Sequence, residues 1–316
     1  MSVPSISVLI PVHNGADYLD EALASLAAQT FSDFEIVVVD NASTDGTPDL
    51  LARWTACEPR LRTLRLERNQ LAASLNRAAD LARAPIFARL DADDIARPDR
   101  FARQYAALRD RPSVGLLGSS ATLIDGGGRR LGEIRPPQAD KDIRHWHATS
   151  SAIIPSSAMM RAEVFRRAGG YREGLNISED YDLWIRMGEH GALANLAEIL
   201  IDYRVHGGSV TGRHPVRMAL ASLCVSAAVE ARRQGLEEPF SPSGAPSLRA
   251  ALPLLGLSRR EALRLVRYRS ASNAATRRLL GLPVPPFVRA LSPRLLRRLG
   301  LRPAYHAWLR SRLGNS

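Results

Sequence analysis

Three carboxylates within four residues, Asp91, Asp93 and Asp94, are the strongest chemical signal in this 316-residue sequence. The segment before them, residues 86–90, is short and bounded by Pro85, which is typical of a buried strand in a parallel sheet. Carboxylates this close repel one another unless a cation lies between them. Carboxylate oxygens suit Mg²⁺ or Mn²⁺, which in turn bind phosphate oxygens. The pattern therefore predicts a metal–phosphate site at the end of a strand, where open α/β sheets place ligands.

These acids also allow a simpler interpretation as helix caps. Asp94 or Asp99 could cap a helix that begins after Pro98. A second acidic pair, Glu179 and Asp180, could likewise be N-terminal helix acids that the helix dipole favours. The elements around these residues decide between the interpretations.

The acids must be positioned by strands, and strand–helix alternation recurs four times before residue 95. We predict strands at 6–12, 34–40, 61–66 and 86–90, separated by helices that begin near 17, 47 and 71. This alternation predicts a doubly wound, mostly parallel α/β sheet. Because neighbouring parallel strands end side by side, Pro11 and Val12, Asp40, and Asp91 with Asp93 are expected to share one crevice.

Periodicity loosens after residue 100. We predict a strand at 114–125 that returns at 130–135, a helix after Ser178, a strand-like segment at 192–205 and a helix at 218–232, whereas 138–160 shows only a mixed pattern. A Pro/Ser/Gly-rich stretch over 238–247 indicates a linker. The expected organisation is an α/β domain over 1–237, this linker, and an extension of short Arg/Leu-rich helices over 248–316.

Several common enzyme classes lack their motifs in this chain. The turn after the first strand, residues 11–15, holds one glycine instead of Gly-x-Gly-x-x-Gly, which disfavours NAD binding. No P-loop and no Gly-x-Ser-x-Gly elbow is present. A nucleotidyltransferase shares the need for carboxylates and Mg²⁺, but it would usually show a basic phosphate loop here, and residues 11–18 contain no cation.

Composition places the chain among ordinary globular proteins, with 45% hydrophobic and 24% charged residues. No run approaches the roughly 18 apolar residues of a membrane span, and the N-terminus leads directly into a strand pattern. We therefore expect neither a transmembrane helix nor a secretory signal. The two cysteines, far apart in the sequence, fit a reducing cytoplasm.

The net charge of +11 is concentrated at the C-terminus. Residues 247–316 hold 15 Arg and one acid, giving +14, and the rest of the chain carries −3. Arg with Leu, Val and Trp at helical spacing suits a membrane surface rich in anionic lipid, at the inner face of the cell membrane. A helical cap with a basic outer face explains the same composition. Nucleic acid is not expected as a partner, since no recognisable binding motif accompanies the arginines.

Four groups of residues in order resemble glycosyltransferase family 2. They are Ile-Ser-Val-Leu-Ile-Pro-Val-His-Asn-Gly from residue 6, Gln29-Thr30 with Val-Val-Val-Asp-Asn-Ala-Ser-Thr-Asp-Gly-Thr from 37, Leu-Asp-Ala-Asp-Asp from 90, and Ser-Glu-Asp-Tyr-Asp-Leu-Trp from 178 followed by Tyr-Arg-Val-His from 203. The resemblance spans roughly residues 5–210 and does not include the C-terminal extension.

This resemblance implies a GT-A fold, an inverting mechanism and a nucleotide-sugar donor, with a UDP-sugar as the first expectation. By position, Asp40 would contact the nucleobase and Asp91 the ribose. Asp93 would bind the Mg²⁺ or Mn²⁺ that holds the diphosphate, and Asp180 would be the catalytic base. Further positions implied for the donor side are Pro11, Val12, Asn69 and Ala92, and for the metal or diphosphate His206.

One departure from the family pattern affects the functional hypothesis. The usual Asn-x-Gly-Leu is Asn69-Gln70-Leu71 here, and the spacing from Asn69 to Asn76 is one residue short. Our main hypothesis is a glycosyltransferase that moves a sugar to a polysaccharide or glycolipid acceptor. The alternative is a GT-A domain without turnover that serves as a membrane-docked binding protein. The Asn69 segment favours the alternative, whereas intact Asp93 and Asp180 oppose it.

Overall fold

The computed structural model describes residues 3–147, 151–206, 215–264 and 266, and their contacts divide the chain into two units. The first unit holds the described residues up to Val205, and the second begins at His206. All of the candidate residues except His206 belong to the first unit.

The first unit contains one sheet and the helices that cover it. Its strands are β1 (Ile6–Val12), β2 (Phe34–Asn41), β3 (Leu61–Leu66), β4 (Ile86–Arg89), β5 (Ile95–Ala96), β6 (Val114–Ile124), β7 (Arg130–Ile134), β8 (Met159–Arg161) and β9 (Ala192–Arg204). Its helices are α1 (Leu19–Ala27), α2 (Thr47–Cys57), α3 (Leu71–Leu81), α4 (Arg100–Asp110), α5 (Asp140–Trp146), α6 (Ala162–Arg167) and α7 (Glu179–Met187), with a 3₁₀ turn η1 (Pro155–Ser157).

The sheet is mixed and mostly parallel, as predicted. The strand order is β3-β2-β1-β4-β8-β6-β9-β5, and β7 pairs with β6. β1, β2, β3, β4, β6 and β9 run in one direction, while β5, β7 and β8 oppose them. The carboxyl ends of the first group therefore meet at one edge, which we call the site edge.

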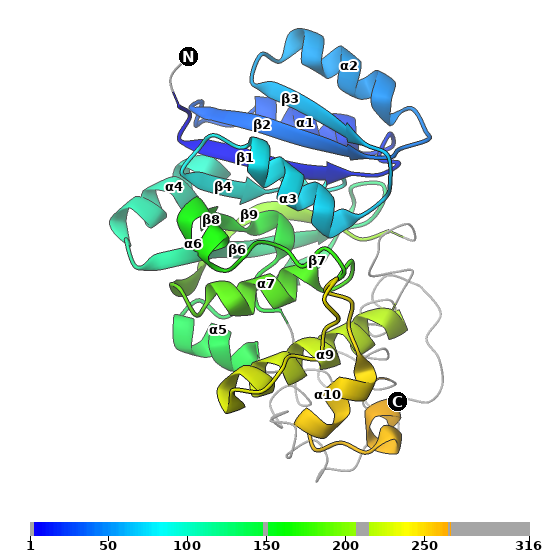
Figure 1. Ribbon diagram of the computed structural model, residues 1–316. Coiled ribbons are helices and arrows are strands. Elements are labelled where there is room, and N and C mark those ends of the chain that lie inside the picture. Colours follow the sequence, from blue (N-terminus) through cyan, green and yellow to red (C-terminus); the bar gives the residue numbers. More distant parts are fainter. Residues whose placement is uncertain (1–2, 148–150, 207–214, 265, 267–316) are drawn as a thin grey trace. The chain divides into compact units, whose positions relative to one another are not determined.

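Helices cover both faces of the sheet because the central strands are apolar on both faces. In β1, Ile6, Val8 and Ile10 join a core that includes residues of α1, α2 and α4. The intervening Leu9 joins a second core with residues of α3, α6 and α7. In Figure 1, α3, α6 and α7 lie in front of the sheet and α1 lies behind it. This two-sided burial explains the continuous apolar runs in the sequence.

The region that looked mixed, residues 138–160, contains ordered elements. It supplies α5, η1 and the start of β8, which pairs antiparallel with both β4 and β6. β8 therefore separates the parallel strands β4 and β6 within the sheet, and the sheet is not a continuous parallel layer.

The described part of the second unit is mainly helical. α9 (Pro215–Gln234) packs on α10 (Leu248–Leu254) through Cys224, Ala227 and Ala251, all buried. Residues 238–247 contain neither helix nor named strand and are closed by an isolated bridge between Phe240 and Pro246. The Arg-rich helices predicted beyond residue 266 lie outside the described residues. Among the described helices, none has the length and apolar character needed to cross a bilayer.

Candidate active site

The first wall of the site edge is formed where β1 and β2 end. Pro11 and Val12 are buried, and Val12 lies opposite Asp40 in the strand register. The loops that follow are interlocked: the Asn14 N–H donates to Ser43 Oγ at 2.9 Å, and the Thr44 N–H donates to Asn14 Oδ1 at 2.7 Å. Asn14 has a left-handed backbone, with φ at 51°. Such strain persists only where the surroundings fix it, so these loops form a rigid wall.

Asp40 is buried at this wall and already paired. Its Oδ1 accepts from the Ser43 N–H at 2.9 Å, and its Oδ2 accepts from Arg65 Nη1 at 2.8 Å. The Arg65 side chain is 55% exposed, so the pair opens to solvent on its arginine side. Each carboxylate oxygen has two lone-pair sites, so Asp40 can still accept a hydrogen bond from a nucleobase.

Asn69 lies next to the end of β2. Its Oδ1 accepts from Asn41 Nδ2 at 2.9 Å, and Asn41 Oδ1 accepts from the Gln70 N–H at 2.8 Å. The segment without the usual glycine is therefore tied to the site edge by Asn41. Asn69 itself remains exposed.

The three acids after β4 divide into two roles. Asp91 and Asp93 are half-buried, whereas Asp94 is buried. Asp94 Oδ1 accepts from the Arg204 N–H at 2.7 Å, which ties the turn to the end of β9. Burial, with the nearby Asp93 and Asp91 charges, raises the pKa of Asp94 well above its usual range. Asp94 thus has a structural role at the end of β9, whereas Asp91 and Asp93 remain partly exposed to solvent.

Helix capping does not account for these acids. Asp99 precedes α4 but makes no side-chain cap hydrogen bond, and Asp94 contacts β9 instead of a helix. The repulsion between these acids is also offset by the protein, not only by the cation that the sequence predicts. Arg89 Nε lies 3.0 Å from Asp91 Oδ1, so the protein supplies one cation itself.

The donor set fits a hard divalent ion. Asp93 offers a half-buried carboxylate, and Arg204 Nε holds its carbonyl oxygen at 2.8 Å. In the described ranges, no three His, Cys, Asp or Glu side chains form a metal cluster. Mg²⁺ is often held by one or two carboxylates with substrate phosphates and water, so Asp93 suits an ion that arrives with a diphosphate. His206 follows β9 as the first residue of the second unit, and its position relative to Asp93 stays a prediction.

The second acidic pair is brought to the same edge by α7. Ser178 precedes the helix in a left-handed conformation, with φ at 64°, and Glu179 is buried. Arg89 Nη1 lies 3.3 Å from Glu179 Oε1. Burial, reinforced by the Asp180 charge, raises the pKa of Glu179 to about 7. Burial also raises the pKa of Asp180, although the Arg89 charge opposes that shift.

Arg89 is the residue that sequence reasoning missed. The sequence pattern places Arg89 only in a buried strand, whereas its side chain, which is 4% exposed, contacts both acidic motifs. The available signal was its type: a charged residue inside an apolar strand is rarely buried without partners.

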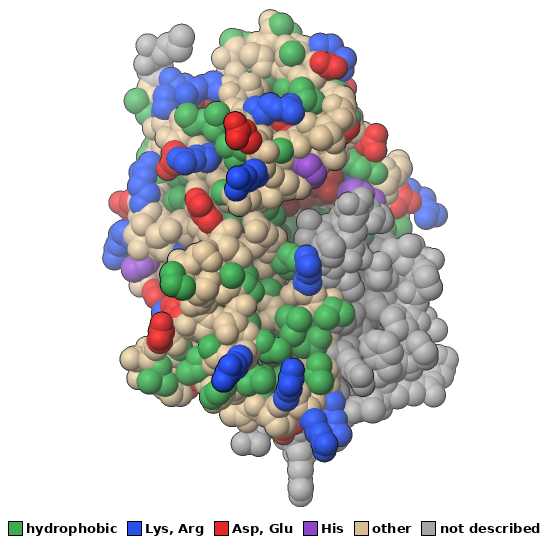
Figure 2. All heavy atoms as spheres, turned by 45° about the vertical axis from the view of Figure 1, so that its right-hand side comes forward, with side chains coloured by type: hydrophobic (Ala, Val, Ile, Leu, Met, Phe, Trp, Pro, Cys, Tyr) green, Lys and Arg blue, Asp and Glu red, His purple; other side chains and the backbone are tan. Residues whose placement is uncertain are grey.

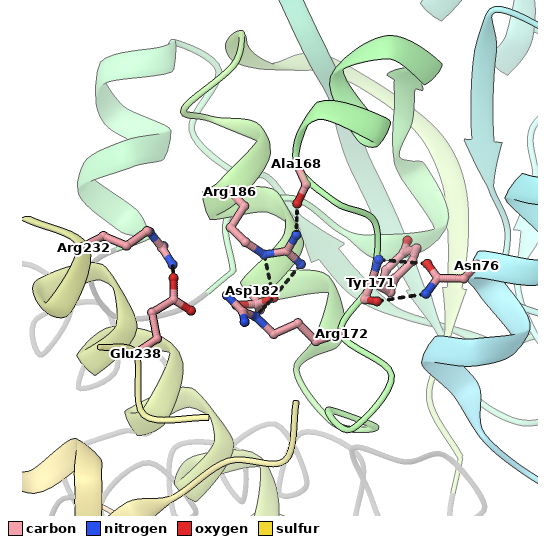
Figure 3. A network of polar contacts seen from close by, with 8 residues as sticks. All are labelled: Asn76, Ala168, Tyr171, Arg172, Asp182, Arg186, Arg232 and Glu238. Atoms are coloured by element: carbon pink, nitrogen blue, oxygen red, sulfur yellow. Dashed lines mark hydrogen bonds and ion pairs between the residues drawn. The ribbon is translucent and has the colours of Figure 1, made fainter. Parts of the chain in front are cut away.

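Loop 168–178, which leads into α7, is held from two sides (Figure 3). Asn76 of α3 accepts from the Tyr171 N–H and donates to the Tyr171 carbonyl, each at 2.9 Å. On the other side, Asp182 of α7 pairs with Arg172 at 3.1 Å and with Arg186 at 2.6 Å. These contacts join α3, the loop and α7, and they fix the position of Glu179 and Asp180 at the start of α7.

Comparison with known proteins gives consistent matches. The model of the family described as "Glycosyl transferase family 2" matches residues 7–169. The O-antigen biosynthesis glycosyltransferase WbnJ of Escherichia coli is 32% identical over 208 residues, which cover 65% of this chain and 81% of that relative.

Two solved structures share the fold. Staphylococcus aureus TarS 1-349 in complex with UDP-GlcNAc is similar with a TM-score of 0.59 and 19% identity, over 85% of this chain and 73% of that one. The mannosyltransferase PcManGT from Pyrobaculum calidifontis, in complex with GDP-Man and Mn²⁺, gives a TM-score of 0.55 and 22% identity, over 99% and 85% of the two chains.

Proposed function

This chain belongs to glycosyl transferase family 2, and we propose that it is an inverting enzyme that moves a sugar from a UDP-sugar to a glycan or glycolipid acceptor. It is a glycosyltransferase with a GT-A-like fold. The hypothesis of a docking protein without turnover loses its support, because the Asn69 segment that favoured it is held at the site edge by Asn41.

The proposal is carried by one observation: Arg89 contacts both Asp91 of the first acidic motif and Glu179 beside Asp180. The residues that we propose for donor binding and for the base would thereby lie together at the site edge. The nucleotide-sugar donor is supported by neighbours that bind UDP-GlcNAc and GDP-Man. The glycan acceptor is supported by the relative in O-antigen biosynthesis.

On the donor side, the residues bind and orient. Asp40, fixed by Arg65, would accept a hydrogen bond from the base, and Asp91 would accept from the ribose. Pro11, Val12 and Ala92 would shape the wall against the nucleoside. Asp93 would hold a Mg²⁺ or Mn²⁺ ion, whose charge would offset the negative charge that develops on the leaving diphosphate.

On the acceptor side, Asp180 would take the proton of the attacking hydroxyl. The acceptor oxygen forms a bond to the anomeric carbon from the face opposite the diphosphate, and the bond between that carbon and the phosphate oxygen breaks. A single displacement of this kind inverts the anomeric centre and needs one positioned base. A raised pKa suits this role because the resulting carboxylate is a stronger proton acceptor.

Nucleotide release from a panel of UDP- and GDP-sugars, with Mn²⁺ and with candidate acceptors, tests the proposal. We expect release with at least one UDP-sugar, and its loss in EDTA and in Asp93→Ala, with the circular dichroism of that variant unchanged. Full activity in EDTA would remove the metal from the mechanism, and release from GDP-sugars alone would overturn the UDP assignment.

The Arg-rich extension supports a further part of the proposal, peripheral contact with an anionic membrane surface. Such contact would bring the site to a lipid-linked acceptor. The attraction is electrostatic, since residues 247–316 carry +14.

A further inference from the structure

Arg89 is a buried cation whose main chain and side chain are both fixed. Its N–H donates to the Ala158 carbonyl at 2.9 Å, and its carbonyl accepts from Arg100 Nη2 at 2.8 Å. Its guanidinium uses different nitrogens for its two partners: Nε faces Asp91 at 3.0 Å and Nη1 faces Glu179 at 3.3 Å. The side chain therefore spans from the turn after β4 to the first residue of α7.

Arg89 lies among several anions, and the Arg100 guanidinium, which interacts with Asp91, is a second cation nearby. Asp91 approaches from its own strand end, and Glu179 and Asp180 approach from α7. From loop 168–178, the Tyr171 ring lies with its centroid 6.0 Å from Arg89 Cζ. Two carboxylates, those of Asp91 and Glu179, thus contact one guanidinium. The Arg89 charge also opposes the rise in the pKa of Asp180.

We propose that Arg89 is a positioning residue that couples the two halves of the active site, holding Asp91 of the donor motif and the Glu179–Asp180 pair in one geometry and offsetting the negative charge of that pair. This inference rests on the proposed function, because it assigns Arg89 to the donor and base residues of the same reaction. Arg89 itself touches neither donor nor acceptor in this scheme.

Two features of arginine are required for the role. The planar fork carries several donors in fixed directions, so it contacts two carboxylates at once, whereas lysine is a point charge. Its permanent charge also lowers the proton affinity of nearby acids. Removing the charge leaves buried carboxylates uncompensated, and they respond by binding protons. Losing Arg89 should therefore disable the base by protonation, in addition to any loss of stability.

Arg161 provides a matched control on the adjacent strand β8. It lies opposite Ile86, at the far end of β4 from the site edge. Its guanidinium donates to the main-chain carbonyls of Val114 at 3.0 Å and Leu108 at 2.8 Å. Arg161→Met thus removes a partly buried arginine that lies away from the acidic pairs.

The test compares Arg89→Met, Arg89→Lys and Arg161→Met in the full chain, with pH profiles of kcat and donor affinity by calorimetry. For Arg89→Met we expect kcat at pH 7 to fall by about 10²-fold or more, the scale of a lost base. The acid limb of its profile should move up by about one pH unit or more. Arg89→Lys should keep the acid limb near the wild-type position but lose kcat by about tenfold, because one contact is lost. Arg161→Met should keep the profile.

A second readout does not depend on activity. In Arg89→Met the folded acids have pKa values raised above the unfolded values, so stability falls as pH rises through that window. The decrease in Tm relative to wild type should grow from pH 5 to pH 8, whereas that of Arg161→Met should stay constant.

The outcomes distinguish a failure of the role assigned to Arg89 from a failure of the proposed function. An unshifted acid limb and a pH-independent Tm decrease in Arg89→Met would overturn the role of Arg89. If that variant does not fold, wild-type kcat in Arg89→Lys would overturn it instead. A wild-type chain that turns over no nucleotide-sugar would refute the proposed function, while the Tm measurement would still decide whether the Arg89 charge lowers the proton affinity of the pair.

Discussion

At the scale of single residues, the assignment of the base depends on environment more than on residue type. Glu179 and Asp180 are adjacent carboxylates, but Glu179 is buried against Arg89 and Asp180 is half-buried at the start of α7. Glu179 is therefore held in an ion pair with Arg89, and this leaves Asp180 as the acid of the two that we propose for the base. Because burial raises the pKa of Asp180, the rate should rise with pH as this acid loses its proton and then level off.

Replacing Asp180 by Asn tests the base directly. The change is nearly isosteric, yet the amide cannot take the acceptor proton, so kcat should fall by about 10²–10⁴-fold. Donor affinity, measured by calorimetry, should stay near wild type because we propose that Asp180 acts on the acceptor and does not bind the donor. Asp110→Asn, at an exposed aspartate ending α4, should change neither quantity. A wild-type rate in Asp180→Asn, with a large loss in Glu179→Gln, would make Glu179 the base.

At the scale of elements, the proposed role of α7, which carries the base, requires its first turn to be held at the site edge. A short helix gains little stability from its own hydrogen bonds, so its position depends on packing and on loop 168–178. Asn76 clamps that loop at Tyr171, and the Tyr171 ring packs edge-on against Trp184 of α7, with centroids 6.4 Å apart. Gly170 allows this approach, since a Cβ there would lie 2.9 Å from Asn76 Oδ1.

Asn76→Ala should loosen the loop without touching the acids. It leaves the Tyr171 N–H and carbonyl without their partner, which costs about 1–3 kcal/mol of stability. Misplacing α7 should lower kcat by about tenfold, and hydrogen exchange should show faster exchange in loop 168–178. Asp80→Ala is the control, because Asp80 lies on the same helix and its side chain is 67% exposed. Normal exchange and normal kcat in Asn76→Ala would show that the clamp does not position the base.

The elements that could be predicted from sequence are those whose signal is local. β1 and β2 are buried on both faces, so their apolar runs are continuous and easily identified. β5 has two residues and β8 has three, too few for any periodicity, and they exist because partner strands already stand beside them. The parallel pairing of β6 with β9, and the contact between Arg89 and Glu179, join residues about 80–90 positions apart. No local pattern encodes such separations.

At the scale of the whole molecule, the net charge differs in sign between the two parts of the chain. The sequence up to residue 246 carries −3 and the remainder +14. On the face drawn in Figure 2, acidic and basic side chains alternate over the upper part of the first unit. The described part of the second unit shows hydrophobic side chains with isolated basic side chains between them. Val216, Leu236 and Leu263 of that unit are each 52% exposed. Apolar and cationic groups together are typical of a membrane surface contact.

We therefore predict that the full chain sediments with vesicles containing phosphatidylglycerol at low salt and is released by 1 M NaCl. Salt acts because it shortens the screening length from about 10 Å at 0.1 M to about 3 Å at 1 M. Each arginine near such a surface contributes about 1 kcal/mol, so replacing four by Gln should weaken binding by about 10³-fold. The four lie in the extension: Arg294, Arg297, Arg298 and Arg302.

The matched control replaces four exposed arginines of the first unit by Gln: Arg77, Arg103, Arg109 and Arg129. It removes the same number of charges but leaves the extension intact, so sedimentation should not change. Equal losses in both variants would mean that net charge alone drives the contact, without a role for the extension. A full chain that stays in the supernatant at low salt would refute membrane contact and favour a helical cap. A segment with a net charge of +14 over 70 residues should bind an anionic bilayer if its arginines are accessible to the lipid headgroups.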